Sequence, residues 1–382
     1  MSTSESQKAD GPRVCIITTP RPKAGILPLS NLVDVLYPLT SYLYVITGNE
    51  AGKVLDERKH IRGHSIMSRP RKNIFLEAIR YLALQIRISY RALSQLKNVD
   101  MFIFFEGECL LLPLLVAKIF CKPAVLSLAA SMPNMIDAEK KISLAPKMLK
   151  ALELINYRLC DKIVLFSRSL VKDWHLEEYQ DKILIAHNHF LDLNAFDVGE
   201  KSTEKEYMIG YIGRLEIEKG VLNFAEALQE LSEYLDSGKL LIGGNGSLSN
   251  KVTDLIEKAD LSKRLIMPGW IGHDDLPGYL RELRFIVLPS YTEGLPNIML
   301  EAMASGSVVL ATPVGAIPDY ISDGKTGFLM RDNSPGCIVQ NIIRALESPN
   351  LDKIIENARG VVEREFTYEA TIKGWKGALE HI

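Results

Sequence analysis

The sequence predicts an α/β protein with two successive parallel-sheet domains. Short apolar runs of strand length alternate with helical stretches along the chain, and this series starts again after a polar, charged segment at 197–206. The length of 382 residues also suits two domains better than one. We therefore expect an N-terminal domain over 11–196 and a C-terminal domain over 207–365.

Each half supplies the elements of such a domain. In the first half, we expect helices at 73–96 and 144–159, where apolar residues recur at helical spacing, and strands at 14–17, 42–47, 101–105, 124–128 and 162–166. In the second half, helices are expected at 221–235, 251–259 and 298–304, and strands at 208–212, 239–242, 265–267, 285–288 and 308–311.

The composition excludes several classes of protein. With 45 Lys and Arg against 47 Asp and Glu, the chain has a net charge of −2, which excludes a nucleic-acid binder driven by electrostatics. Five cysteines without a C-x-x-C pair predict buried thiols in a reducing compartment, not disulfides or a metal site. The polar start at 1–10 is unlike a secretory signal, and the apolar run at 109–120 is too short to span a bilayer. We expect a cytoplasmic protein.

The strongest motif places two glutamates around the start of a helix. Glu293 lies in the loop after the strand at 285–288, and Glu301 lies in the first turns of the helix that begins near Pro296. A helix N-terminus at the carboxyl end of a parallel strand attracts phosphate. Glu301 would then accept hydrogen bonds from ribose hydroxyls, and Glu293 would face a sugar. The alternative is two surface glutamates around an ordinary helix start.

A second motif places two cations after a strand. Arg214 and Lys219 follow the strand at 208–212, in the loop that leads to the next helix. A guanidinium and an ammonium here would neutralise a diphosphate leaving group while its bond to a sugar breaks. The alternative is a pair of solvated side chains beside the turn glycine Gly220.

Two further motifs are weaker. Gly243-Gly244-Asn245-Gly246-Ser247 joins a strand to a helix, but Gly244-x-Gly246-x-x-Ser249 lacks the third glycine of a dinucleotide fingerprint, which favours an ordinary tight turn. The stretch at 311–328 reads as another strand, glycine turn and helix, and would form one more wall of the same cleft.

Together, these motifs resemble those of the retaining GT-B glycosyltransferases (glycosyltransferase group 1, family 4 type). The resemblance covers essentially the whole chain and is strong over 208–328. It rests on Gly213-Arg214-Leu215 with Lys219-Gly220, and on Glu293 and Glu301 with seven residues between them. It implies two doubly wound Rossmann-like domains that face a cleft, with the segment 366–382 returning to the N-terminal domain as a helix.

The resemblance also implies roles for individual residues. Catalytic roles fall to Arg214, Lys219 and Glu293, Glu301 would hold the ribose, and Gly25 would lie on the acceptor side. No metal is implied. The implied donor-binding set is Gly213, Arg214, Lys219, Gly244, Ile271, Glu293, Gly294, Leu295, Asn297 and Glu301.

Two positions depart from the family pattern. Where many members carry a histidine that lines the donor sugar, after the strand at 124–128, this chain has Ala129-Ala130, and none of its seven histidines falls nearby. The paired-glycine loop near the first strand is reduced to Lys23-Ala24-Gly25.

The implied activity is transfer of a hexosyl group from a nucleotide sugar to a glycan or lipid-linked acceptor of the cell envelope. Anomeric configuration would be retained, without cofactor or metal. Two alternatives stay open. A non-catalytic nucleotide-sugar-binding subunit or sensor would fit Ala129, and a nucleotide-sugar epimerase would share the fold.

Positive charge gathers in the first half. Between Arg58 and Lys97 the chain carries ten Lys or Arg and one acidic residue, Glu77, a local charge of 10 − 1 = +9. Arg80, Arg87 and Arg91 would fall within about 40° of one another on a helix. They predict peripheral contact with an anionic membrane, with a solvated basic face as the alternative and no nucleic acid.

Overall fold

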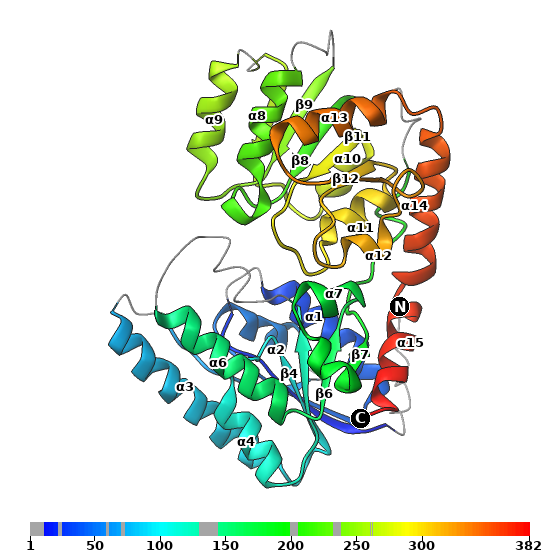
Figure 1. Cartoon of the computed structure of the whole chain (residues 1–382). Helices are drawn as coiled ribbons and strands as arrows, with labels where there is room; N and C mark the ends of the chain where they lie inside the picture. The colour runs from blue at the N-terminus through cyan, green and yellow to red at the C-terminus, as the bar shows by residue number, and fades with distance from the viewer. Residues whose placement is uncertain are drawn as a thin grey trace.

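The computed structural model describes residues 11–21, 25–58, 61–69, 73–129, 144–198, 205–231, 238–259, 261 and 263–382. It has two lobes, each a parallel sheet covered by helices, with the N-terminal lobe at the bottom of Figure 1 and the C-terminal lobe at the top. The predicted fold class, an α/β fold with two doubly wound sheets, is confirmed.

Within the described residues, the N-terminal sheet has seven parallel strands in the order β3-β2-β1-β4-β5-β6-β7. Helices cover it, so its central strands are buried throughout and apolar along their length. The strands are β1 (Arg13–Ile17), β2 (Tyr42–Thr47), β3 (Arg62–Ser65), β4 (Met101–Phe105), β5 (Ala124–Leu128), β6 (Lys162–Leu165) and β7 (Ile183–Ile185). The helices are α1 (Ile26–Leu36), α2 (Lys53–Glu57), α3 (Ile74–Gln95), α4 (Leu111–Ile119), α6 (Leu144–Leu159) and α7 (Ser169–Asp173), with the 3₁₀ turns η2 (Tyr37–Leu39), η3 (Glu50–Gly52) and η4 (Glu177–Lys182).

The C-terminal sheet has six parallel strands in the order β10-β9-β8-β11-β12-β13. They are β8 (Tyr207–Ile212), β9 (Lys239–Gly243), β10 (Leu265–Gly269), β11 (Leu283–Leu288), β12 (Val308–Ala311) and β13 (Phe328–Leu329). The helices are α8 (Val221–Leu231), α9 (Ser249–Lys258), α10 (Leu276–Arg281), α11 (Asn297–Ala304), α12 (Ile317–Tyr320) and α13 (Pro335–Leu346), with the 3₁₀ turn η5 (Ile217–Lys219).

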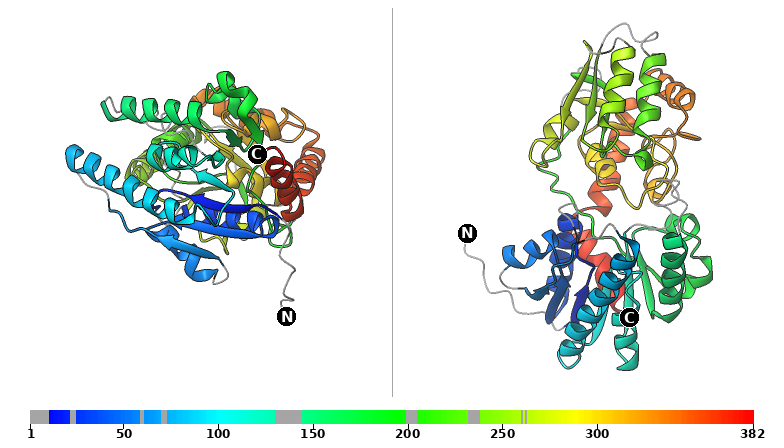
Figure 2. Two further views of the ribbon diagram at one scale, coloured as in Figure 1. Left: turned by 90° about the horizontal axis from the view of Figure 1, so that it is seen from below. Right: turned by 90° about the vertical axis from the view of Figure 1, so that its left-hand side faces the viewer.

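The last two helices connect the lobes. Helix α14 (Leu351–Glu365) packs on α11 and β12 of the C-terminal lobe, and α15 (Tyr368–Leu379) packs on α1 and β7 of the N-terminal lobe. The right-hand view of Figure 2 shows the orange-red α14 against the C-terminal lobe and the red α15 against the N-terminal lobe. Trp375 of α15 is fully buried, and the Thr371 hydroxyl donates to the His189 carbonyl at 2.9 Å. The chain therefore crosses between the lobes twice, at the segment before β8 and at the α14–α15 junction.

The strand order places a ligand site in each lobe. It reverses between β1 and β4 in the N-terminal sheet and between β8 and β11 in the C-terminal sheet. In open parallel sheets, ligands bind outside the carboxyl ends of the strands at such a reversal. The loops after β1, β4, β8 and β11 are therefore the expected positions for a site.

The sequence predicted most central elements to within two residues, and the bounds 124–128 and 144–159 coincide with β5 and α6. The helix expected at 221–235 is described only as far as Leu231, and the remainder lies outside the described residues. Among the elements missed are the edge strands β3, β7 and β13. Strand β3 (Arg62–Ser65) has no apolar run, because an edge strand pairs on one side only and stays largely exposed.

Candidate active site

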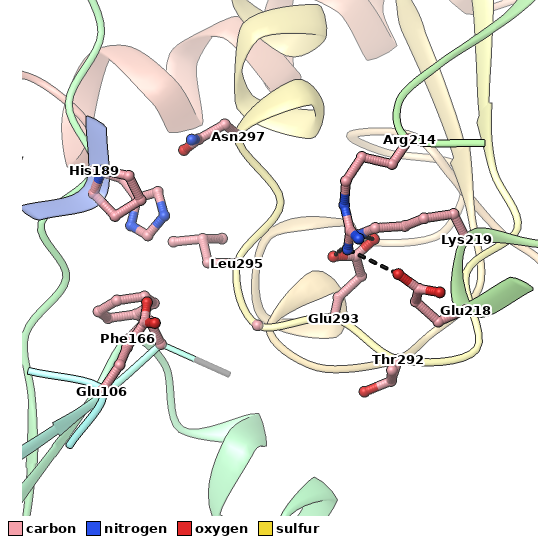
Figure 3. Close-up of a pocket in the computed structure, with 13 residues that line it drawn as sticks. Glu106, Phe166, His189, Arg214, Glu218, Lys219, Thr292, Glu293, Leu295 and Asn297 are labelled. Carbon is pink, nitrogen blue, oxygen red and sulfur yellow. Dashed lines mark hydrogen bonds and ion pairs between the residues drawn. The ribbon is translucent and has the colours of Figure 1, made fainter. Parts of the chain in front are cut away.

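A cavity of about 210 Å³ lies between the two lobes, at the carboxyl ends of both sheets. Figure 3 shows Glu106 and Phe166 of the N-terminal lobe on one side of it, with Arg214, Lys219 and Glu293 on the other. It is smaller than the roughly 300–1,000 Å³ of pockets that enclose whole small molecules, so it suits a sugar or a diphosphate group. It is lined by Pro28, Glu106, Ala129, Phe166, His189, Arg214, Glu218, Lys219, Thr292, Glu293, Gly294, Leu295 and Asn297.

Arg214 lies in the loop after β8, and its backbone is held on both sides. The Tyr211 hydroxyl donates to the Arg214 carbonyl at 2.6 Å, and the Leu215 amide donates to the Asn245 carbonyl at 3.0 Å. The Arg214 guanidinium pairs with the Glu218 carboxylate at 2.8 Å, yet 48% of the Arg214 side chain remains exposed. The guanidinium can therefore turn toward an incoming anion while its backbone stays in place.

Lys219 is held by Glu293, which lies 74 residues further along the chain. The Lys219 ammonium donates to both carboxylate oxygens of Glu293, at 2.7 and 2.8 Å, and the Ser290 hydroxyl donates to Oε1 at 2.7 Å. Only 9% of the Glu293 side chain is exposed. Because each carboxylate oxygen carries two lone pairs, these bonds leave one acceptor position on Oε2. The arrangement fixes an ammonium at the cavity wall.

Glu301 lies one helical turn after Asn297, on the same face of α11. Burial raises the pKa of the Glu301 carboxyl to about 7. The His273 ring nitrogen Nδ1 lies 4.0 Å from Oε1. The carboxyl is therefore partly protonated near neutral pH, and a ligand that donates hydroxyl hydrogen bonds to it would favour its ionised form.

Two glycines permit close backbone contacts around the cavity. A Cβ on Gly294 would lie 2.1 Å from the Ala129 carbonyl oxygen, so this position lets the two lobes meet. Gly244 has φ +126°, and a Cβ there would lie 1.8 Å from the Gly213 carbonyl oxygen. The Ile271 side chain packs over the neighbouring Gly243. Gly213, Gly244 and Ile271 thus form one layer beside the cavity.

The N-terminal side of the cavity contains a buried carboxylate. Glu106 directly follows β4 and forms an ion pair with Arg21, whose Nε also donates to the Thr18 hydroxyl at 3.2 Å. Burial raises the pKa of Glu106, and the Arg21 charge opposes this shift. Glu106 has φ +45°, a left-handed conformation that costs a non-glycine residue about 1–3 kcal/mol. Such strain tends to persist where function requires it.

Residues 194–361 match the family model described as Glycosyl transferases group 1. These residues are similar to the members of that family. The matched range is just under half of the chain and contains Arg214, Lys219, Glu293 and Glu301.

Relatives of known sequence extend this group 1 likeness. Two uncharacterised glycosyltransferases of Methanocaldococcus jannaschii are 24% and 26% identical over 266 and 257 residues, which are 69% and 65% of this chain and 72% and 65% of those proteins. The lipopolysaccharide 1,2-N-acetylglucosaminetransferase of Salmonella typhimurium is 29% identical over 172 residues, 42% of this chain and 44% of that protein. The chain therefore matches less than half of that third relative.

Solved structures share the two-lobed fold. Anabaena HepE in complex with UDP has a TM-score of 0.76 at 15% identity, covering 97% of this chain and 100% of that one. The apo form of the lipopolysaccharide outer core galactosyltransferase WaaB has a TM-score of 0.70 at 17% identity, covering 97% and 99%. These likenesses establish the GT-B fold of the whole chain.

The C-terminal lobe brings six of the ten predicted donor-binding residues into one cavity wall. Glu301, Gly213, Gly244 and Ile271 do not line the cavity, and Gly25 precedes α1, three residues before the lining residue Pro28. The alternative of two surface glutamates is wrong, because the side chains of Glu293 and Glu301 are both at least nine-tenths buried. The six residues in the wall are Arg214, Lys219, Glu293, Gly294, Leu295 and Asn297.

Sequence reasoning missed most of the N-terminal wall. Glu106 could have been found, because it directly follows the buried strand β4 and so obeys the same strand-end rule as Arg214. No histidine lies near Ala129 in the sequence, but the fold brings His189 to the same cavity. The segment that carries His189 is distant in sequence and gave no signal. Ala130, Lys23 and Ala24 lie outside the described residues.

His189 stays neutral at physiological pH. Burial and the neighbouring His187 lower its pKa to about 3, although the Leu295 carbonyl accepts a hydrogen bond from its ring. The ring also packs edge-on against Phe166, with 4.8 Å between centroids. Because Leu295 belongs to the C-terminal lobe, His189 acts as a neutral contact between the lobes.

The described residues contain neither a membrane-spanning helix nor a metal-binding cluster. Among the described helices, none is both long enough and apolar enough to cross a bilayer. The described part of the chain also contains no cluster of three or more His, Cys, Asp or Glu side chains placed to hold a metal ion. Independence from metal stays a prediction.

Proposed function

We propose that this protein is a retaining glycosyltransferase that moves a hexosyl group from a nucleoside-diphosphate sugar to a glycan or lipid-linked acceptor. The observation that carries the proposal is the position of Arg214 and Lys219, at the strand-order reversal of the C-terminal lobe and facing a cavity between the lobes. HepE, with the same fold, is known with UDP and with UDP-glucose, which supports a nucleotide-sugar donor.

The donor diphosphate lies between the two cations. Arg214 turns from Glu218 to one phosphate, and Lys219, held by Glu293, contacts the other. Together they neutralise the charge that develops on the leaving group, without a divalent ion. Full activity in EDTA is the expected result. Loss of turnover in EDTA that manganese restores would contradict this part of the proposal.

The remainder of the donor extends from the cavity toward α11. Glu301 accepts hydrogen bonds from the ribose, and the layer of Gly213, Gly244 and Ile271 flanks the base. This division fits the cavity size, since about 210 Å³ is less than the roughly 300–1,000 Å³ of pockets that enclose a whole small molecule.

The sugar is transferred with retention by attack from the side of the leaving group. An acceptor hydroxyl oxygen bonds to the anomeric carbon as the bond from that carbon to the phosphate oxygen breaks. The hydroxyl proton moves to the departing phosphate oxygen. The hydrogen bonds that Glu293 accepts from Lys219 and Ser290 support attack by the acceptor itself, because a carboxylate bound in this way is a poor nucleophile. Glu293 then holds Lys219 and uses its remaining lone pair for the sugar.

The acceptor enters against the N-terminal wall, between Glu106 and the start of α1. A carboxylate held by Arg21 can accept hydrogen bonds from acceptor hydroxyls. We assign the reaction to cell-envelope glycan synthesis on the cytoplasmic side. The lipopolysaccharide transferases among the similar proteins and the five free cysteines support this assignment.

One rival follows from a specific observation. Ala129 lines the cavity where many members of the resembled family carry a histidine, and a non-catalytic nucleotide-sugar-binding subunit would tolerate that loss. The paired Lys219 and Glu293 favour the enzyme, because an ammonium held at the cavity can neutralise the charge that develops on a leaving phosphate. The described geometry gives no comparable support to an epimerase.

The test begins with a thermal-shift panel of nucleotide sugars, because a ligand that binds the folded state raises the melting temperature. The stabilising sugar is then incubated with the protein alone. Slow release of free sugar and nucleoside diphosphate supports a transferase. Conversion to an isomeric nucleotide sugar would identify an epimerase, and binding without turnover would identify a sensor.

A further inference from the structure

Helix α3 has an unusual outer surface. Its inner face packs on the sheet through buried residues that include Leu84, Ile88 and Ala92. Its opposite face is also apolar, with six large side chains that are between 42% and 79% exposed. At about 100° per residue, these six fall within an arc of about 80°, so they form a continuous line. We call this line the outer stripe: Phe75, Ile79, Leu82, Ile86, Tyr90 and Leu93.

The outer stripe is long and lies at an edge of the molecule. Figure 1 and Figure 2 show α3 along the outside of the N-terminal lobe. Its 22 residues extend about 33 Å at 1.5 Å per residue. Ile119 and Phe120, at the end of the neighbouring helix α4, are also exposed. Single exposed apolar residues are ordinary, whereas a contiguous apolar surface of this length marks a contact site.

Basic side chains follow one edge of the outer stripe. The Arg91 guanidinium lies 5.8 Å from the centre of the Tyr90 ring, which belongs to the stripe. Arg87 lies about 60° round the helix from Tyr90, on the same side as Arg91, and donates to the Met67 carbonyl at 3.1 Å. Arg80 differs, because it forms an ion pair with Glu77 and donates to Ser68. The sequence led us to expect that Arg80, Arg87 and Arg91 all contribute to the membrane contact. Because Arg80 is paired with Glu77, we now assign the contact to Arg87 and Arg91. Arg87 and Arg91 retain the clearest charge, and the apolar residues supply the larger surface.

We propose that α3 lies flat on an anionic bilayer, with the outer stripe inserted among the acyl chains and Arg87 and Arg91 at the level of the headgroups. A helix with an apolar face and an adjoining basic face binds in this way. A second copy of the chain fits less well, because it would bring the same local charge of +9 between Arg58 and Lys97 against this one.

The docked position would place the bilayer beside the cavity. Strand β3 ends at the cavity side of its sheet, and α3 begins shortly after it, at Ile74. The Tyr81 hydroxyl donates at 3.0 Å to the carbonyl of Cys109, three residues after Glu106 of the cavity wall. If the proposed function holds, a lipid-linked acceptor would enter from that side. Docking itself does not depend on transferase activity.

The experiment is flotation of the full chain with vesicles of neutral phosphatidylcholine, or of phosphatidylcholine with phosphatidylglycerol. The stripe variant is Ile79→Gln/Leu82→Gln/Ile86→Gln. Its matched control, Ile185→Gln/Ile266→Gln/Met267→Gln, removes three exposed apolar side chains elsewhere. We expect the wild type and the control to float with anionic vesicles. The stripe variant should lose at least tenfold in partitioning while keeping its thermal midpoint and nucleotide binding.

A second variant tests the contribution of the two arginines. Arg87→Gln/Arg91→Gln should lower binding to anionic vesicles and leave binding to neutral vesicles unchanged. Equal flotation of the stripe variant and the control would overturn the proposal, and so would a wild type that does not float. A wild-type dimer that the stripe variant dissociates, with no vesicle binding, would assign the stripe to a second copy instead.

Discussion

The C-terminal wall of the cavity comes from two short segments, 214–219 and 292–297, whereas the N-terminal wall combines single residues from five separate segments. The first wall pairs two cations with two carboxylates, and the second is mostly apolar around Glu106. A compact charged wall suits a ligand that changes little among related enzymes, such as a diphosphate. A wall assembled from separate loops can vary residue by residue, as the acceptor does.

The largest effect is expected at Lys219. Lys219→Met removes the ammonium that would neutralise the leaving phosphate, so transfer should fall by roughly 10²–10³-fold. It should also reduce the free energy of unfolding, because Glu293 is left buried without its ammonium partner. The expected loss is near the lower end of about 3–5 kcal/mol, because one-fifth of the Lys219 side chain is exposed to solvent. Kinetics and denaturant titration measure the two losses separately.

The control is the double variant Lys219→Met/Glu293→Gln, which removes both charges. It should recover much of the stability and none of the transfer activity. If activity returned with stability, Lys219 would have a structural role only.

Glu106 tests the opposite wall. Glu106→Gln keeps the shape of the side chain and removes the charge, so transfer to the acceptor should fall at least tenfold while donor hydrolysis and donor binding stay within about twofold. Glu108→Gln is the matched control, since Glu108 is buried close by but does not line the cavity. An equal loss of donor hydrolysis would contradict the division between the walls.

At Glu301 we expect a smaller effect on nucleotide affinity, and this effect depends on pH. Burial raises the pKa of this carboxyl to about 7, above the ordinary value of about 4.3, so ionisation is unfavourable in the free folded protein. The contribution of Glu301 to the free energy of unfolding should therefore fall as pH rises from about 4.5 to 7. Ribose hydroxyls favour the ionised form, so nucleotide affinity should rise over pH 5.5–7.5 and level off above that range. Glu301→Gln should flatten this profile in calorimetry, and an unchanged profile would exclude the ribose contact.

The sequence predicted the C-terminal wall of the cavity better than the N-terminal wall, because the two walls are built differently along the chain. Arg214 and Lys219 share one loop after a strand, and Glu293 to Asn297 share another, so local spacing reveals them. Their pairing across 74 residues follows from the adjacency of β8 and β11, which the order of residues along the chain does not show. His189 reaches the cavity from the segment after β7, where no local pattern points to a site.

The same limit applies to α3. Helical spacing predicted its bounds to within one residue, but both of its faces are apolar, so periodicity alone could not decide which face is buried. The structure decides it, because the sheet packs against Leu84, Ile88 and Ala92 and leaves the outer stripe exposed. The predicted domain boundaries at 196 and 207 stay predictions.

The central claim is that a nucleoside diphosphate binds between Arg214 and Lys219. Calorimetry with the nucleoside diphosphate of the stabilising sugar tests it most directly. The comparison is between wild type, Arg214→Ala and the control Arg331→Ala, in which an exposed arginine is removed away from the cavity. Loss of a charge-assisted hydrogen bond costs about 1.5–3 kcal/mol, so Arg214→Ala should bind roughly ten- to a hundredfold more weakly than wild type and Arg331→Ala should match wild type. Equal affinity for all three proteins would contradict the account.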